Sequence, residues 1–396
     1  MTELFPPTRA EALSRLSAFV PRAGRHYAQV RNIDPGPGNR HDVSLLSPYL
    51  RHRLITEREV VAAVLAHHSL VDAEKFVQEV LWRTYWKGWL EMRPTVWDRF
   101  TDERDAVRVN FRGTKDLDRA EAGMTGIEGF DDWARELVAT GYLHNHARMW
   151  FASIWIFTLR LPWTLGADFF MRNLVDADPA SNTLSWRWVA GLQTPGKTYL
   201  ATADNIARYT GGRFTPTGLA TSAIPLTEAP VPAPLALTAL AANTPGVSAL
   251  LLVTPEDMNL ESLFAPAASF KGAVVLSRAT GGGAISQAFV AGAAKDAAAR
   301  VRAHFGCPVS IIDTLDPEII RVAAAEAQVS TIVTGCAPVG PIAGALSLAT
   351  AELQRSNIHI VQHRRSWDAQ FWPHARKGFF AFKEQIPQIL TRERLC

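Results

Sequence analysis

A stretch from Thr140 to Trp188 places several polar side chains inside an apolar, tryptophan-rich sequence. These side chains are His144, Asn145, Arg148, Asp176, Asp178 and Asn182. Burying a polar or charged group is costly unless the group is paired or serves a ligand. Arg148 and Asp176 can form a salt bridge with each other, but this pair leaves Asp178 and Asn182 unexplained. The stretch therefore predicts a buried ligand site.

Length and composition indicate a globular protein of two domains. The chain of 396 residues is too long for one typical hydrophobic core. Its hydrophobic and charged fractions, 47% and 20%, are ordinary for a globular protein. A net charge of +3 permits binding to nucleic acid without requiring it. Neither half of the chain is strongly basic, so any contact with DNA must come from a local patch.

Several features favour a cytoplasmic protein without a membrane anchor. The three cysteines, Cys307, Cys336 and Cys396, are far apart and in no metal-binding spacing, which is typical of reduced thiols. The N-terminus shows no signal-peptide pattern. The most apolar window, 149–163, is interrupted by Arg160 and is too short to span a bilayer, so we expect a buried helix there.

Within residues 1–161, several segments have the apolar spacing of amphipathic helices. Helices are expected at 8–20 with Thr8 as N-cap, at 72–92, at 130–141 with Gly141 as the stop, and at 143–161. The charged segment 93–124 is expected to be a surface connection with short helices.

Two short segments could hold an anion or a substrate. Ser44 and Ser47 lie at the first turn of an expected helix, where hydroxyls and free N–H groups suit an anion, although on these residues alone a simple capped helix is the favoured interpretation. In the helix at 72–92, Trp82 belongs to an aromatic stripe of the kind that usually forms core. Glu79, one turn before Trp82 on the same face, would be expensive to bury without a partner.

These motifs together resemble the FAD-binding core of the photolyase/cryptochrome family. TGYLHNHARM at 140–149, DADPASN at 176–182 and WRW at 186–188 match that family's TGW-hydrophobic-HNxxRM, DGDxAxN and WxW blocks, with the spacings kept. VSLLSPYL at 43–50 resembles the family's phosphate segment TSRLSPYL but departs from it at its first and third residues. EVLWRTY at 79–85 resembles the family's E-L-x-W-R-E-F.

The resemblance implies FAD as cofactor. By this likeness the segment 43–47 and Arg83 would lie near the phosphates, Asp178 would take the N3/O4 edge of the flavin, and Asn182 would face N5. The residues implied to bind FAD are Tyr27, Val43, Ser44, Leu45, Leu46, Ser47, Phe76, Glu79, Arg83, His144, Asn145, Arg148, Asp176, Asp178 and Asn182.

The resemblance also implies light-driven repair of UV-induced pyrimidine dimers, in which excited FADH⁻ gives an electron to a dimer flipped out of damaged DNA. Glu79 and Asn145 would hydrogen-bond the base carbonyls. The walls of the cavity would be Trp82, Met149 and Trp188. The HN pair favours cyclobutane dimers over (6-4) products. Trp186 and Trp163 match the first two tryptophans of the family's electron-transfer chain, and the third has no match at the expected place.

Other interpretations stay open or are set aside. The alternative is a cryptochrome-like blue-light photoreceptor that binds FAD without repair, favoured by the shortened domain and the missing third tryptophan and opposed by Glu79 and Asn145. A helical protein without a cofactor leaves the buried polar groups unexplained. A metal site is rejected, because His144 and His146 point different ways on a helix and no cysteine or carboxylate completes a ligand set.

The C-terminal half predicts a second domain of different class. A Pro/Ala linker at 221–237 separates an all-helical FAD-binding domain at 1–220 from a Rossmann-like α/β domain with a parallel sheet at 238–396. The expected strands are 247–254, 272–278, 308–314, 329–335 and 358–363. In the family that this chain resembles, the α/β antenna domain precedes the helical one, so the order here is inverted and the antenna pigment is unknown. We expect a monomer.

Overall fold

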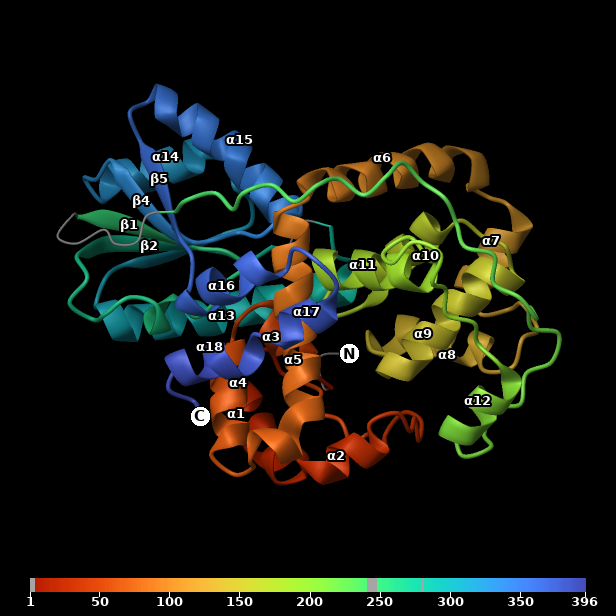
Figure 1. Ribbon diagram of the computed structural model, residues 1–396. Helices are drawn as coiled ribbons and strands as arrows, with labels where there is room; N and C mark the ends of the chain where they lie inside the picture. Colours follow the sequence, from red (N-terminus) through yellow and green to blue (C-terminus); the bar gives the residue numbers. More distant parts are fainter. Residues whose placement is uncertain (1–3, 241–247, 279–280) are drawn as a thin grey trace.

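The computed structural model describes residues 4–240, 248–278 and 281–396, which form a helical part followed by an α/β part (Figure 1). The helical part consists of α1 Arg9–Phe19, η1 Val20–Arg22, α2 Arg25–Val30, α3 Ser47–Arg51, α4 Glu57–Leu65, α5 Leu70–Glu91, α6 Pro94–Phe111, α7 Lys115–Glu121, α8 Phe130–Thr140, α9 Asn145–Ser153, the π-helical turn η2 Ile154–Thr158, α10 Trp163–Asn173, α11 Pro179–Val189 and α12 Ala203–Tyr209.

Capping residues set most of the helix ends that the sequence predicts. Thr8 caps α1 by accepting a hydrogen bond from the backbone N–H of Glu11. Gly141 ends α8 in the left-handed conformation, with φ of 71°, which glycine adopts without strain. The helix expected at 72–92 is α5, which begins after its N-cap Ser69 and spans 22 residues. These helices confirm the periodicity argument.

Two helix predictions need correction. The segment 93–124 is not a connection of short helices, because α6 alone is 18 residues long with Pro94 in its first turn. Only Val96 and Phe100 are buried along α6, so its apolar stripe is too thin to recognise in the sequence. The single helix expected at 143–161 is α9 followed by the π-helical turn, and Arg160, at φ of 54°, lies beyond its end.

The α/β part is a five-stranded parallel sheet in the order β3-β2-β1-β4-β5, which confirms the predicted Rossmann-like class. Its elements are β1 Ala249–Val253, η3 Leu260–Ser262, β2 Phe270–Leu276, α13 Ala284–Phe305, β3 Val309–Ile312, α14 Pro317–Glu326, β4 Thr331–Gly335, α15 Pro341–Arg355, β5 His359–His363, α16 Ser366–Phe371, η4 Trp372–His374, α17 Phe379–Lys383 and α18 Ile386–Arg392. Each expected strand overlaps one of the five, and Val247 of the first lies outside the described residues.

Alternate residues of the strands enter two different cores. In β1, Leu250 and Leu252 pack with α14 and α15, whereas Leu251 and Val253 face α13 and the helical part. This follows from the two-residue repeat of a strand. The cluster that contains Leu251 also contains buried residues of α1, α4 and α5, so one continuous core joins the sheet to the N-terminal helices.

Residues 51–53 of the helical part lie at the point where the strand order reverses. The carboxyl ends of β1 and β4 flank this point, where doubly wound sheets commonly bind ligands. Here the loop after β1 binds the helical part instead. Arg51 donates two hydrogen bonds to Glu256 at 2.5 and 2.7 Å, and the backbone N–H of Met258 donates to the carbonyl of His52 at 3.0 Å.

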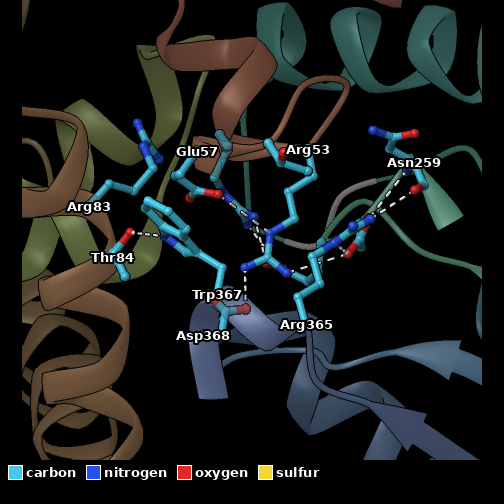
Figure 2. Close-up of polar contacts among 12 residues, drawn as sticks. Arg53, Glu57, Arg83, Thr84, Asn259, Arg365, Trp367 and Asp368 are labelled. Atoms are coloured by element: carbon cyan, nitrogen blue, oxygen red, sulfur yellow. Dashed lines mark hydrogen bonds and ion pairs between the residues drawn. The ribbon is translucent and has the colours of Figure 1, made fainter. Parts of the chain in front are cut away.

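A second set of buried ion pairs continues this contact toward the C-terminus (Figure 2). Arg53 lies 2.5 Å from a carboxylate oxygen of Asp368 and 3.3 Å from one of Asp257. Arg365 donates two hydrogen bonds to Asp257, at 2.6 and 2.8 Å. Arg53, Asp257 and Asp368 are each about 1% exposed. Buried ion pairs therefore hold together three segments that are far apart in sequence.

The last thirty residues return to α5. The indole N–H of Trp367 donates to the hydroxyl of Thr84 at 3.1 Å, as Figure 2 shows, and the Tyr85 hydroxyl donates to the carbonyl of Lys377 at 2.8 Å. Residues 221–237, the expected linker, contain neither helix nor strand, and the backbone N–H of Leu235 donates to the carbonyl of Met92. The predicted domain boundaries, 1–220, 221–237 and 238–396, stay predictions.

Within the part of the chain that the structure describes, no helix is both long and apolar enough to cross a membrane. Cys307 and Cys336 are buried free thiols, and Cys396 is an exposed one.

We predict that Asp257→Asn lowers the free energy of unfolding by about 3–5 kcal/mol, because it leaves the buried Arg365 without its anion. Urea unfolding followed by circular dichroism measures this change. The matched control is Arg355→Ala, which removes an exposed ion pair with Glu352 and should leave the unfolding midpoint unchanged. Equal effects of the two substitutions would contradict the assignment.

Candidate functional site

A cavity of about 120 Å³ lies between α2, the segment before α3, α5 and the start of α9. Of the residues that the sequence predicts for the site, nine line it: Tyr27, Val43, Ser44, Leu45, Leu46, Ser47, Glu79, His144 and Asn145. The structure therefore brings together the phosphate-like segment, the carboxylate of α5 and the HN pair, which are about a hundred residues apart at their extremes.

Two buried polar groups of this cavity have no hydrogen-bond partner in the described residues: Ser47 Oγ and His144 Nε2. His144 Nδ1 accepts from the backbone N–H of His146 at 3.2 Å, so the ring proton lies on Nε2. Burial lowers the pKa of His144 to about 4, and the ring is neutral at pH 7. The cavity thus offers a hydroxyl and an imidazole N–H to a ligand.

Glu79 forms an ion pair with Arg31 of α2. Burial raises the pKa of the Glu79 carboxyl, and Arg31 opposes this shift. Phe76, one turn earlier on α5, contacts Tyr27 edge-on with ring centroids 5.2 Å apart. The predicted Phe76 therefore supports the wall formed by Tyr27 and does not itself line the cavity.

The two aspartates of the DADPASN motif are held by arginines. Asp178 caps α11 by accepting from the backbone N–H of Ser181 at 2.8 Å, and its other oxygen pairs with Arg83. Asp176 lies 3.7 Å from both Arg83 and Arg148. The predicted pairing of Arg148 with Asp176 is confirmed.

A strained residue separates these carboxylates. Ala177 has φ of 36°, a conformation that favours glycine, and the related motif has glycine at this place. Burial would raise the pKa of Asp178, but Arg83, Arg51 and Lys87 outweigh it and hold that pKa well below its usual range. Asp178 is therefore an anion at pH 7.

Asn182 and the tryptophans do not line the cavity. The Asn182 side-chain amide donates to the carbonyl of Ala167 at 2.8 Å. Trp82 stacks on Phe379 of α17, with ring centroids 3.7 Å apart. Trp188 stacks on Tyr199 at 5.8 Å. Met149, one turn after Asn145 on α9, is half-buried. The roles of Trp82, Met149, Trp188 and Asn182 stay predictions.

Trp186 and Trp163, the predicted electron-transfer residues, are both buried. The Trp186 ring lies 6.2 Å from that of Trp155, and its indole N–H has no partner in the described part of the chain. Trp163 lies 5.5 Å from Phe100 of α6. Their role in electron transfer stays a prediction.

Several residues of the site were not identified from the sequence. Arg31, Asn32 and Tyr142 also line the cavity. The signal for Arg31 was its place one helical turn after Tyr27, and Tyr142 lies inside the TGYLHN motif itself. Lys87 helps to lower the pKa of Asp178. The sequence does not predict this role, because lysine on a helix usually faces water.

In residues 4–240, 248–278 and 281–396 no three histidine, cysteine, aspartate or glutamate side chains gather where they could bind a metal ion.

Comparisons with known proteins agree with these motifs. The family model of the FAD-binding domain of DNA photolyase matches residues 76–211. The deoxyribodipyrimidine photo-lyase of Agrobacterium fabrum is 33% identical over 196 residues, covering 48% of this chain and 40% of that protein. An enzyme of the same name from Thermus thermophilus is 32% identical over 213 residues, covering 54% of this chain and 49% of that protein.

A solved structure of a bacterial class III photolyase from Agrobacterium tumefaciens matches 53% of this chain and 44% of its own, with 29% identity and a TM-score of 0.45. The chain thus spans about half or less of the length of the relatives it matches.

The helical part is a flavin-binding domain of photolyase type. Through it the chain is related to the photolyase/cryptochrome family, and its cofactor is FAD.

The cavity suits FAD in chemistry more than in size. The unpartnered Ser47 hydroxyl and His144 N–H are donors of the kind that a pyrophosphate requires. A volume of about 120 Å³ is well below the roughly 300–1,000 Å³ of a typical small-molecule site. The cavity is therefore only part of the candidate FAD site, because Arg83, Asp178 and Asn182 lie outside its lining.

We predict that Gly166→Ala destabilises the protein by about 1–3 kcal/mol, because the added Cβ would lie 2.3 Å from the Trp186 ring. The control is Gly344→Ala in α15, where nothing lies within 4 Å of the new atom and the substitution should be neutral or stabilising. Thermal unfolding measures both. A Gly166→Ala protein as stable as the parent would contradict the close packing of α10 on Trp186.

Proposed function

We propose that the protein is a FAD-dependent DNA photolyase that repairs UV-induced pyrimidine dimers under blue light, with cyclobutane dimers preferred over (6-4) products. The observation that carries this proposal is one cavity in which Glu79 and Asn145 lie beside the segment 43–47 and His144. Relatives that share this helical segment are named deoxyribodipyrimidine photo-lyases. Damaged DNA is then the partner.

The residues proposed to hold FAD divide into two groups. The segment 43–47, with the Ser47 hydroxyl, would contact the phosphates. On the other side, Asp178 would accept from the flavin edge, its charge maintained by Arg83. Asn182, whose amide N–H is bound to the carbonyl of Ala167, would present its carbonyl oxygen toward the ring. Bound and reduced FAD would supply the photoexcited electron.

The protein's own task is to place the dimer and to exclude water. Asn145 is exposed at the mouth of the cavity, and Glu79 lies on its wall. Both side chains could hydrogen-bond the base carbonyls of a flipped dimer. For Glu79 to do so, its contact with Arg31 must open, and the raised pKa of Glu79 favours the protonated carboxyl, which can donate a hydrogen bond to a carbonyl oxygen. Trp186 and Trp163 would return electrons to the flavin.

A blue-light photoreceptor without repair activity is the second candidate. It is favoured by one observation, the stacking of Trp82 on Phe379, because this contact covers one face of a ring that repair would need. In this alternative Glu79 stays bound to Arg31. Localisation in the cytoplasm and the monomeric state are parts of the proposal in either case.

We predict that Ser47→Ala weakens FAD binding about ten-fold, since it removes one hydrogen bond to a charged group without breaking any contact within the protein. Titration of the apoprotein with FAD, followed by flavin fluorescence, measures the affinity. The matched control is Ser286→Ala, which removes another buried unpartnered hydroxyl outside the cavity and should bind FAD normally. Unchanged affinity in Ser47→Ala would refute the phosphate assignment.

The function itself is tested by repair of a thymine-dimer oligonucleotide by the reduced protein under blue light. We expect recovery of thymine absorbance, and at least a ten-fold slower rate in Glu79→Gln with FAD content unchanged. The control on the same helix is Glu74→Gln, whose carboxylate pairs with Lys383 and does not line the cavity. Bound FAD that photoreduces without repair of single- or double-stranded lesions would replace this proposal with the photoreceptor.

A further inference from the structure

The segment from Arg376 to Phe380 exposes an aromatic ring beside two cations. The Phe380 side chain is 83% exposed, although it directly follows the buried Phe379. Arg376 and Lys377 are exposed as well. Within residues 4–240, 248–278 and 281–396 neither of these side chains forms an ion pair. Isolated exposed apolar residues are common, but a ring with unneutralised cations beside it is a specific combination.

The backbone of this segment is fixed to the helical part. Arg93 donates to the carbonyl of Arg376 at 2.7 Å, and the Tyr85 hydroxyl donates to the carbonyl of Lys377 at 2.8 Å. Phe379 stacks on Trp82 with an interplanar angle of 10°. These contacts hold the carbonyls and Phe379 inward, so the side chains of the exposed residues are directed to solvent without being free to move as a loop.

The segment also lies next to the cavity. Trp82 follows Glu79 by three residues on α5, a rise of about 4.5 Å, and Glu79 lines the cavity. Because Phe379 covers one face of Trp82, α17 lies directly beside that wall; its packing on α5 is visible in Figure 1. Residues 376–380 therefore lie near the part of α5 that contributes Glu79 to the cavity.

We propose that residues 376–380 form a contact site for a DNA strand, in which a base stacks on Phe380 and phosphates pair with Arg376 and Lys377. This inference rests on the proposed function and identifies an additional part of the DNA contact. Aromatic side chains flanked by cations are the usual means of holding single-stranded or unpaired nucleotides. Trp82 is already stacked on Phe379, so Phe380 is the ring that remains free for a base.

The chemistry of the surroundings favours DNA over a protein partner. The exposed residues next to Phe380 in sequence are Gly378, Ala381 and, one helical turn on, Glu384, so no wider apolar surface surrounds the ring. Glu74 of α5 pairs with Lys383 of α17 at 2.8 Å, so this acid is neutralised within the protein. A protein hot spot would require an apolar rim that excludes water, whereas a nucleotide needs one ring face and unpaired cations.

The test is binding of a fluorescently labelled thymine-dimer oligonucleotide by the full FAD-loaded chain, followed by anisotropy at several salt concentrations. Phe380→Ala should raise Kd about ten-fold, and Phe380→Trp should restore the affinity. Arg376→Ala with Lys377→Ala should lower the slope of log K against log salt by about 1.5, the loss of two phosphate contacts. Controls are Leu348→Ala, another exposed apolar residue, and Lys271→Ala with Lys295→Ala.

The outcomes separate this inference from the proposed function. If the parent protein binds and repairs DNA, and the Phe380 and Arg376/Lys377 variants keep its affinity and salt slope, the contact site is refuted but the proposed function stands. Weakened binding in Phe380→Ala, in a protein that never repairs DNA, would support the contact and overturn repair. A parent chain that binds no DNA would overturn both. Thermal unfolding should be unchanged in all variants, because the substituted side chains are exposed.

Discussion

The buried charges at the carboxyl end of β1 are the interaction on which the rest of the structure depends. Transfer of an ion from water into the protein costs several kcal/mol, which is recovered only when a partner and further hydrogen bonds are in place. Arg51 and Arg53 pair with Glu256, Asp257 and Asp368, which lie outside the helical part, and Arg53 also lies 4.0 Å from Glu57 of α4. Neither part can therefore keep this surface buried without the other. The crevice that a doubly wound sheet normally offers to a ligand serves here as a docking site for helices.

Helix α5 links this interface to the cavity. Glu79 and Arg83 lie on the side of the site, whereas Thr84 and Tyr85 bind the C-terminal segment. Lys87, further along the same helix, has no hydrogen-bond partner among the described residues, yet its charge and that of Arg51 help to keep Asp178 ionised. The electrostatics of the flavin site are thus set partly by residues of the interface. A lysine that is buried without a partner costs stability, and burial together with Arg53 lowers the pKa of Lys87, while Glu57 and Asp178 oppose this shift.

What the sequence predicts correctly is local. Ser47, Glu79 and His144 converge because each belongs to a motif whose spacing fixes its own helix end or face. The parallel sheet follows from short β-branched runs separated by helices. What it misses depends on distant contacts. The sequence around Trp82 does not indicate that its ring stacks on Phe379. The hydrogen bond from the Tyr85 hydroxyl to the carbonyl of Lys377 joins residues 292 positions apart. Such contacts arise only from the packed arrangement, and the sequence alone does not specify them.

The ion pair of Arg53 with Asp368 joins residues 315 positions apart, and this distance has a consequence for biosynthesis. A ribosome adds about 5–20 residues per second, so roughly 15–60 s separate the synthesis of the arginine from that of its aspartate. Until the sheet and the C-terminal helices have been synthesised within that interval, the apolar face of the N-terminal helices lacks the elements that cover it. The order of the two parts along the chain therefore places the last step of folding after translation is nearly complete.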